Sequence, residues 1–398
     1  MRLAQRMEGV PRSYIREILK VTAQPDIISF AGGLPHPASF PVDAVASAAA
    51  SVLEEAGPEA LQYTTTEGFP PLRQWIADRY KRQGITVSAD DILITTGSQQ
   101  ALDLVAKACI DRGGRVVMER PGYLGAIQCF AVFGPDFVTV PLTPHGVDTD
   151  GLRRAAEGAQ VFYAVPSFQN PSGITYDDAT RREVAEIMAD TGCLLVEDNP
   201  YGELRFMGQH LPPVRAYMQA PSVLLGSFSK VVSPGLRLGW VCAPQDVLNP
   251  MITAKQASDL HTPGFTQRIL HRYLMDNDVD THIASIRARY GAQRDVMVQA
   301  IRRHFPEEVS CTEPEGGMFL WCTLPEGLSA EALFHKAIER KVAFVPGRPF
   351  YVDDTDDTFR LNFSNSSPEL IDEGIARLGQ CLREYLGGCQ GGCRSSAA

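Results

Sequence analysis

A lysine, two serines and an arginine lie close together after one apolar run. Lys230 follows Ser227 and Ser229, and Arg237 comes shortly after it. A lysine that is partly desolvated and near other cations loses its proton more readily, and its neutral amine can form an imine. The planar donor fork of an arginine suits a phosphate. The alternative is a solvated basic loop, and a Ser-x-Lys spacing on its own favours that alternative.

A second polar segment, residues 96–100, follows another apolar run and opens a helical stretch. Gly97 permits a tight turn, and the free N–H groups and positive dipole end of a helix N-terminus attract anions. The segment is therefore a candidate phosphate cradle, with Ser98 and Gln99 at the start of the helix. The alternative is an ordinary helix N-cap by Ser98.

Two more polar segments contain an acid and an amide. Asp198 follows the apolar run at residues 193–196. An acid at the end of a buried strand is costly unless a cation pairs with it, and a protonated pyridine nitrogen would be such a cation. A positive ring nitrogen lets a cofactor ring accept the electrons of a carbanion. The alternative for Asp198 is an ordinary aspartate at a helix N-cap. The amide is Asn170, in residues 168–173, and the alternative there is a plain turn.

The composition excludes several classes of protein. The chain has 398 residues, 44% apolar and 21% charged, which is enough for a large α/β domain and a smaller companion. A formal net charge of -10 disfavours nucleic-acid binding, and no apolar run is long enough to span a membrane. Because the N-terminus lacks the apolar core of a secretory signal, we expect a cytoplasmic protein with nine reduced cysteines. Metal binding by Cys389 and Cys393 is the alternative to a disordered tail, and we expect no metal site.

Apolar runs alternate with helical stretches through the first part of the chain. This alternation is typical of a mainly parallel sheet that helices cover on both faces. In open sheets of this kind, ligands bind beyond the carboxyl ends of the strands, where the polar segments lie. The runs predict a seven-stranded sheet with strands at residues 92–95, 115–118, 137–140, 161–165, 193–196, 223–226 and 238–241.

The pattern changes near residue 278, where an apolar stripe predicts one long helix. The chain after residue 305 has an α+β pattern with a strand near residues 317–321. We place a domain boundary within the long helix. The large domain is expected at residues 41–285, and the smaller α+β domain at 1–40 and 286–398, with residues 387–398 as a disordered tail.

Asn170, Asp198, Lys230 and Arg237, in this order, resemble the class I aminotransferases of pyridoxal-phosphate (PLP) fold type I. The resemblance is greatest to the branch containing 2-aminoadipate and kynurenine aminotransferases, and it extends from about Ser13 to Leu382. Residues 29–35, 95–100, 226–230 and 233–237 carry it. It implies a PLP-dependent transaminase that works by a ping-pong mechanism. Its donors would be 2-aminoadipate, glutamate, leucine or an aromatic amino acid, and its acceptor a 2-oxo acid such as 2-oxoglutarate.

The resemblance also implies a role for each matched residue. Lys230 would hold the cofactor and move the proton, Asp198 would pair with the ring nitrogen, and Tyr123 would stack on the ring. Asn170 and Tyr201 would bind the ring oxygen, and Arg360 would bind the substrate carboxylate near Asn170 and Gly33. The phosphate ligands would be Ser98, Gln99, Ser227, Ser229 and Arg237, together with Tyr63 of the neighbouring subunit, which implies a homodimer.

Substrate choice and reaction type stay open at this stage. Arg16 is our candidate for binding an acidic side chain, and its alternative is a surface arginine. The chain has Ser172 where the family often has threonine, and Asn199-Pro200 where it often has a second acid; Pro200 puts the geometry of the Tyr201 contact in question. Decarboxylases, lyases and racemases share the fold, so another PLP reaction is an alternative, as is a non-enzymatic aminotransferase-like regulator.

Overall fold

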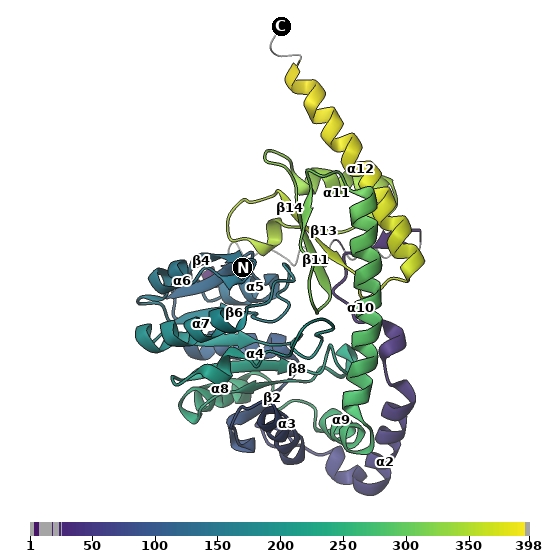
Figure 1. Ribbon diagram of the computed structural model, residues 1–398. Helices are drawn as coiled ribbons and strands as arrows, with labels where there is room; N and C mark the ends of the chain where they lie inside the picture. The colour runs from purple at the N-terminus through teal and green to yellow at the C-terminus, as the bar shows by residue number, and fades with distance from the viewer. Residues whose placement is uncertain (1–3, 8–17, 19–23, 25, 395–398) are drawn as a thin grey trace.

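The computed structural model describes residues 4–7, 18, 24 and 26–394, with side chains up to residue 387. Figure 1 shows one body of sheet and helices, with the long helix α10 (Val279–His304) running past it to a second, smaller group of strands and helices. Arg16 lies outside the described residues. Among the described residues, no helix has both the length and the apolar character needed to cross a bilayer.

The main sheet has eight strands, one more than predicted. Its order is β2-β9-β8-β7-β6-β3-β4-β5, and β3, β4, β6, β7 and β8 are parallel to their neighbours among these five. Strand β9 runs antiparallel to both β2 and β8. The additional strand is the two-residue β5, which pairs antiparallel with β4 through a tight turn. The bounds are β2 Ile92–Thr95, β3 Arg115–Arg120, β4 Asp136–Thr143, β5 Gly146–Val147, β6 Val161–Ala164, β7 Leu194–Asp198, β8 Ser222–Ser227 and β9 Gly239–Cys242.

Helices cover both faces of this sheet, because alternate residues of each strand face opposite sides. Val117 and Phe162 belong to one apolar cluster, whereas Met118 and Tyr163, their neighbours along β3 and β6, belong to the other. Burial of each such side chain contributes about 1.5–3 kcal/mol. The helices are α2 Val42–Ala60, α3 Pro70–Arg82, α4 Ser98–Cys109, α5 Leu124–Ala131, α6 Thr149–Ala156, α7 Asp178–Thr191, α8 Gln245–Ser258 and α9 Gly264–Asp276.

Local signals set the ends of these helices. Asp177 caps the start of α7 by accepting a hydrogen bond from the Thr180 N–H, and Gly192 ends the helix in the left-handed conformation. Asp278 likewise caps α10 by accepting from two backbone N–H groups. Short 3-10 helices lie at Gln5–Met7, Pro37–Ser39, Ala89–Asp91, Val214–Tyr217, Pro234–Leu236 and Arg348–Phe350.

The smaller group of elements follows α10 and includes the start of the described chain. A four-stranded sheet has the order β10-β11-β14-β13, and β1 pairs with β12. The bounds are β1 Ile28–Ser29, β10 Ser310–Cys311, β11 Phe319–Thr323, α11 Ala330–Glu339, β12 Val342–Ala343, β13 Val345–Pro346, β14 Thr358–Asn362 and α12 Pro368–Arg394. Helix α12 continues to Arg394. The disordered tail from residue 387 stays a prediction. The domain boundaries at residues 40 and 285 stay predictions.

The cysteines differ from expectation at one pair. Cys311 and Cys322 lie directly opposite each other in the antiparallel pair β10–β11 and form a disulfide, with their Cα atoms 4.1 Å apart. The prediction that all nine cysteines are reduced is therefore wrong for these two, because strand register, which the spacing does not reveal, brings them together. Cys109, Cys129, Cys193, Cys242 and Cys381 are free.

Candidate active site

The carboxyl ends of the parallel strands open into a cavity of about 400 Å³. It lies where polar segments follow β2, β7 and β8, as expected for an open α/β sheet. Among the described residues, the cavity gathers every predicted site residue except Tyr63. Its predicted lining residues are Gly33, Ser98, Gln99, Tyr123, Asn170, Asp198, Tyr201, Ser227, Ser229, Lys230, Arg237 and Arg360.

Lys230 follows the end of β8 and projects into this cavity. Its Nζ donates a hydrogen bond to the carbonyl oxygen of Gly33 at 2.8 Å. Burial, together with the positive charges of Arg360 and Arg237, lowers the pKa of Lys230 to about 8. A substantial fraction of the amine is therefore neutral near pH 8, which a nucleophile or general base requires.

Asp198, at the end of β7, has one carboxylate oxygen in use and one free. Its Oδ2 accepts a hydrogen bond from the hydroxyl of Tyr163 at 2.8 Å, whereas the buried Oδ1 has no partner. Burial raises the pKa of Asp198 to about 6, although the Tyr163 hydrogen bond opposes this. A buried acceptor without a donor is costly. A protonated ring nitrogen would supply the donor and favour the ionised carboxylate, so the site fits the pyridine ring that the resemblance implies.

Tyr163 is a member of the site that the sequence analysis missed. It lies in β6, within a wholly apolar run, and it is completely buried. The available signal was its hydroxyl, because a buried tyrosine O–H needs a hydrogen-bond partner. Nothing in the sequence identified that partner as Asp198 on the adjacent strand β7.

The turn before α4 fits a phosphate. Gly97 has a φ of 77°, and a Cβ there would lie 2.5 Å from Nη2 of Arg237, so only glycine lets the arginine approach. Nη2 of Arg237 donates to the Thr96 carbonyl oxygen at 3.3 Å. Ser98 begins α4, and the free N–H groups of its first turn point toward the cavity end of the sheet.

An ion pair between a buried lysine and a more exposed aspartate supports this turn from behind, and the sequence analysis missed it. Lys255, which is fully buried, pairs with Asp259 at 2.8 Å and donates to Oε1 of Gln100 at 2.8 Å. The same Oε1 accepts from the Thr96 N–H at 2.8 Å. Asp259 follows the last residue of α8, four residues after Lys255.

Arg360 is a buried cation that has no acidic partner among the residues the structure describes. On β14, its Nη1 donates to Oδ1 of Asn170 and its Nη2 to the Ala31 carbonyl oxygen, both at 2.8 Å, while its Nε has no partner. The guanidinium carbon lies 4.3 Å from the ring centre of Phe319. Burial lowers the pKa of Arg360 to about 10. A buried, aromatic-flanked arginine of this kind is suited to bind a carboxylate.

The other cavity residues that we expect to contact the cofactor ring are aromatic or amide groups. Nδ2 of Asn170 donates to the Tyr201 hydroxyl at 3.4 Å, and Tyr201 packs edge-on against Phe319. Burial raises the pKa of Tyr123 to about 12 and that of Tyr201 in the same direction, so both hydroxyls stay protonated near neutral pH. Phe319 is a further residue that the sequence analysis missed.

Comparison with known proteins decides the family. The model for aminotransferase class I and II matches residues 25–378. The chain belongs to this family. A 2-aminoadipate transaminase of Thermus thermophilus is 44% identical over 384 residues, 95% of this chain and 95% of that protein. Aromatic-amino-acid aminotransferase 1 of Thermococcus litoralis is 40% identical over 391 residues, 95% of this chain and 93% of that protein.

Solved structures agree with this assignment. An α-aminoadipate aminotransferase from Thermus thermophilus, complexed with N-(5′-phosphopyridoxyl)-L-leucine, has a TM-score of 0.91 at 41% identity, covering 97% of this chain and 98% of that one. A kynurenine aminotransferase from Pyrococcus horikoshii has a TM-score of 0.93 at 38% identity, covering 96% and 97%. The predictions of PLP fold type I, of a transaminase and of pyridoxal phosphate as cofactor are confirmed.

Tyr63 of this aminotransferase lies outside the cavity. Its side chain is 79% exposed. Among the aromatic rings of the described chain, its ring meets that of His261 edge-on, with 5.8 Å between the ring centres. Its predicted role toward the neighbouring subunit stays a prediction.

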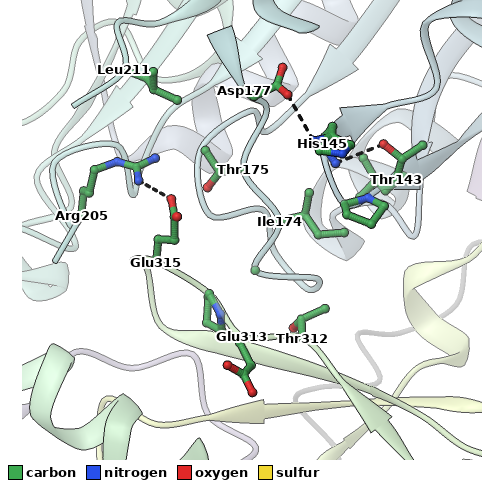
Figure 2. A pocket seen from close by; sticks show the side chains of 14 residues that line it. Thr143, His145, Ile174, Thr175, Asp177, Arg205, Leu211, Thr312, Glu313 and Glu315 are labelled. Carbon is green, nitrogen blue, oxygen red and sulfur yellow. Dashed lines mark hydrogen bonds and ion pairs between the residues drawn. The ribbon is translucent and has the colours of Figure 1, made fainter. Parts of the chain in front are cut away.

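A second cavity, of about 560 Å³, lies between the β4–β5 turn and the loop that precedes β11 (Figure 2). Its charged side chains pair with one another. Arg205 donates to Glu315 at 2.5 Å, and His145 lies 3.2 Å from Asp177. Since these groups already satisfy each other, we assign the chemistry of the aminotransferase to the smaller cavity around Lys230.

Proposed function

We propose that this aminotransferase transfers the amino group of an acidic, aromatic or leucine-like L-amino acid to a 2-oxo acid such as 2-oxoglutarate, in two half-reactions at one site. The names of the relatives support the donors, since they include 2-aminoadipate and aromatic-amino-acid enzymes and a complex with phosphopyridoxyl-leucine. The range of donors would reflect one carboxylate site common to all amino acids and a permissive side-chain site.

The position of Gly33 between Lys230 and Arg360 carries this proposal. Its carbonyl oxygen accepts from Lys230, and a Cβ on it would lie 4.0 Å from Nη2 of Arg360. An amino acid whose carboxylate is held by Arg360 would therefore have its Cα close to the Lys230 amine. Proximity of this kind accounts for much of the rate enhancement in transfers between bound groups.

The chain's residues would divide the work as follows. When bound, pyridoxal phosphate supplies an electron sink and carries the amino group between the half-reactions. Asp198 would keep the ring nitrogen protonated. Lys230 would take the Cα proton as a general base and return it to the carbon that receives the nitrogen, acting from one face of the ring. Tyr123 would cover the ring and limit its motion.

Single-turnover absorbance tests the proposal on the PLP-loaded protein. Glutamate, 2-aminoadipate, leucine, kynurenine and alanine are added separately, and 2-oxoglutarate is added afterwards. We expect each accepted donor to convert the cofactor to its amino form and 2-oxoglutarate to reverse the change. Lys230→Ala should abolish turnover. A bound cofactor that no donor converts would contradict transamination and favour a lyase or decarboxylase.

We also infer that the active unit is a homodimer. Leu61 and Tyr63 are exposed by 71% and 79%, and Leu260, beside the His261 that contacts Tyr63, is exposed by 55%. An apolar surface that continues across two segments is typical of a subunit interface. If a second copy of the chain packed against this surface, the Tyr63 hydroxyl would face the neighbouring subunit.

Arg16 stays our candidate for recognition of an acidic side chain. If it enters the pocket, Arg16→Ala should raise KM for glutamate far more than KM for leucine. Equal changes in the two KM values would discard this role while leaving the aminotransferase assignment intact.

A further inference from the structure

Glu119 is a buried acid that the proposed chemistry does not use. It lies in β3, is 2% exposed and does not line the active-site cavity. Its Oε1 accepts from the Tyr176 hydroxyl at 2.7 Å and the Val165 N–H at 3.1 Å, and its Oε2 accepts from Nε2 of Gln169 at 3.0 Å. None of these described partners is a cation. A carboxyl group is expensive to bury in this way, so its position calls for a reason.

Gln169 continues the hydrogen-bond chain and is itself fully buried. Its Nε2 donates a second bond to the Pro121 carbonyl oxygen at 2.8 Å. Its Oε1 accepts from the backbone N–H of Ser172 at 2.8 Å and from the Ser172 hydroxyl at 2.7 Å. All four hydrogen-bonding positions of the amide are therefore filled. Rotating the amide by 180° would set oxygen against oxygen and N–H against N–H, so only one orientation is allowed.

These hydrogen bonds connect two segments of the active site. Gln169 precedes Asn170, whose Oδ1 accepts from Arg360. Pro121 lies two residues before Tyr123, the residue expected to cover the cofactor ring. One pair of side chains thus connects the carboxylate-binding side of the cavity to the ring-stacking side.

The turn that carries Asn170 is a thin wall between two cavities. Asn170 faces the active-site cavity, whereas Gly173, Ile174 and Thr175 line the larger cleft of Figure 2. The side-chain hydrogen bonds of Gln169 hold this turn together with two backbone bonds, from the Gly173 N–H to the Gln169 carbonyl oxygen at 2.7 Å and from the Gln169 N–H to the Ile174 carbonyl oxygen at 2.9 Å. The Thr312 hydroxyl adds a bond to the Ser172 carbonyl oxygen at 2.9 Å.

We propose that Glu119 and Gln169 are positioning residues of this aminotransferase. They hold Asn170, and through it Arg360, in register with Tyr123 across the cavity. The proposal rests on the roles proposed above for Asn170, Tyr123 and Arg360.

The carboxylate of Glu119 is required because all its partners are donors. An amide at this position has only one acceptor oxygen. One orientation of the amide would set its N–H₂ against Nε2 of Gln169, and the other would set it against the Val165 N–H. Glu119→Gln therefore keeps the size of the side chain and breaks the chain of hydrogen bonds at one point or the other.

The experiment compares Glu119→Gln and Gln169→Leu with a matched control, Glu197→Gln. Glu197 is equally buried, in β7, and accepts from the backbone N–H groups of Val214 and Arg215, away from the cavity. We expect the two test variants to lose roughly 10- to 100-fold in kcat/KM, with higher KM for the amino donor, because misplacement by a fraction of an ångström to 1 Å has effects of this size. The pH midpoint of the bound cofactor's absorbance should shift, while the cofactor stays bound. Glu197→Gln should lower thermal stability and leave kcat/KM within about twofold of the wild type. Because the charge of Glu197 raises the pKa of Asp198, the control for kcat/KM is this variant and its own absorbance midpoint is measured separately.

Two results would overturn the proposal. The first is a kcat/KM and an absorbance midpoint within about twofold of the wild type in both folded test variants. The second is equal losses in Glu197→Gln, which would mean that removing any buried acid has this effect. If Glu119→Gln does not fold, Ser172→Ala removes only the hydroxyl bond to Gln169 and should show the same changes at smaller size; no change there would also count against it. If the wild type transfers no amino group, the proposed function fails, yet the absorbance comparison still tests the positioning role.

Discussion

Lys230 combines burial with two positive neighbours, and this makes its chemistry pH-dependent in a definite direction. Its pKa is lowered to about 8, so the amine is protonated and unreactive below that pH and neutral above it. We expect the rate at which cofactor-free protein binds pyridoxal phosphate covalently to rise with pH around a midpoint near 8. Stopped-flow absorbance measures this rate. Arg360→Met removes one of the positive charges and should move the midpoint to higher pH, whereas a wild-type midpoint near the ordinary lysine value would contradict the burial argument.

Arg360 should depend on its planar fork as well as on its charge. Arg360→Lys keeps the charge but cannot hold the Ala31 carbonyl, Asn170 and a substrate carboxylate together. Loss of a charged hydrogen bond costs about 2–3 kcal/mol, which corresponds to roughly a 30- to 150-fold higher KM for amino donors. Steady-state kinetics measures it. Arg79→Lys is the matched control, because Arg79 pairs with Asp280 and Glu203 away from the cavity. An unchanged KM in Arg360→Lys would remove Arg360 from the carboxylate site.

At the scale of elements, α8 supports the turn before α4 that we expect to bind the cofactor phosphate. Lys255 on α8 fixes Gln100, and Gln100 fixes the backbone of Thr96. Lys255→Met should therefore loosen the turn and weaken cofactor retention by roughly 10-fold, about 1.4 kcal/mol, which equilibrium dialysis with pyridoxal phosphate would detect. Lys107→Met is the control, because Lys107 pairs with Asp103 on α4 and also bonds Ser258 at the end of α8, but has no bond to the turn. Equal cofactor retention in the two variants would show that the Lys255–Asp259 pair does not act on the turn.

The elements differ in how well the sequence predicts them. Strands β2 and β6 are predictable because their runs are fully buried and apolar, and α10 because it has one apolar stripe and an aspartate cap. Strand β5 cannot be predicted in this way, because its two residues are too few to show a periodic pattern. The glycines in residues 387–394 predict irregular chain, because each costs about 1 kcal/mol in a helix, yet α12 includes them.

At the scale of the molecule, the sequence predicts which residues meet but not what supports them. Asp198 and Lys230 could be assigned because each ends or follows an apolar strand and because parallel strands end at one edge. Arg360, which lies in the antiparallel β14, could be assigned only through the family resemblance. Tyr163, Glu119 and Lys255 could not, since their partners are on other strands or helices and depend on register and rotamer. The disulfide between Cys311 and Cys322 is another product of register. Supporting residues of this kind become visible only when the fold is known.

The proposed dimer makes a prediction that depends on the assembled molecule. If Tyr63 completes the neighbouring subunit's site, a mixed dimer of Lys230→Ala and Tyr63→Ala subunits has one site with both residues intact and one site with neither. Each variant alone should have little activity. Co-refolding them in equal amounts should restore about a quarter of the wild-type activity, because half of the dimers are mixed and half of the sites in them are intact.

The control for this mixture is a pair in which each substitution disables the site of the subunit that carries it. Lys230→Ala mixed with Arg360→Ala leaves no complete site in a mixed dimer, since both residues line the cavity of one chain. Recovery in the first mixture and none in the second would establish that Tyr63 acts across the interface. Recovery in neither would mean that Tyr63, 79% exposed in the single chain, serves no neighbouring site. Chromatography at matched concentration would show whether dimers had formed, so failed assembly is distinguished from a wrong role for Tyr63.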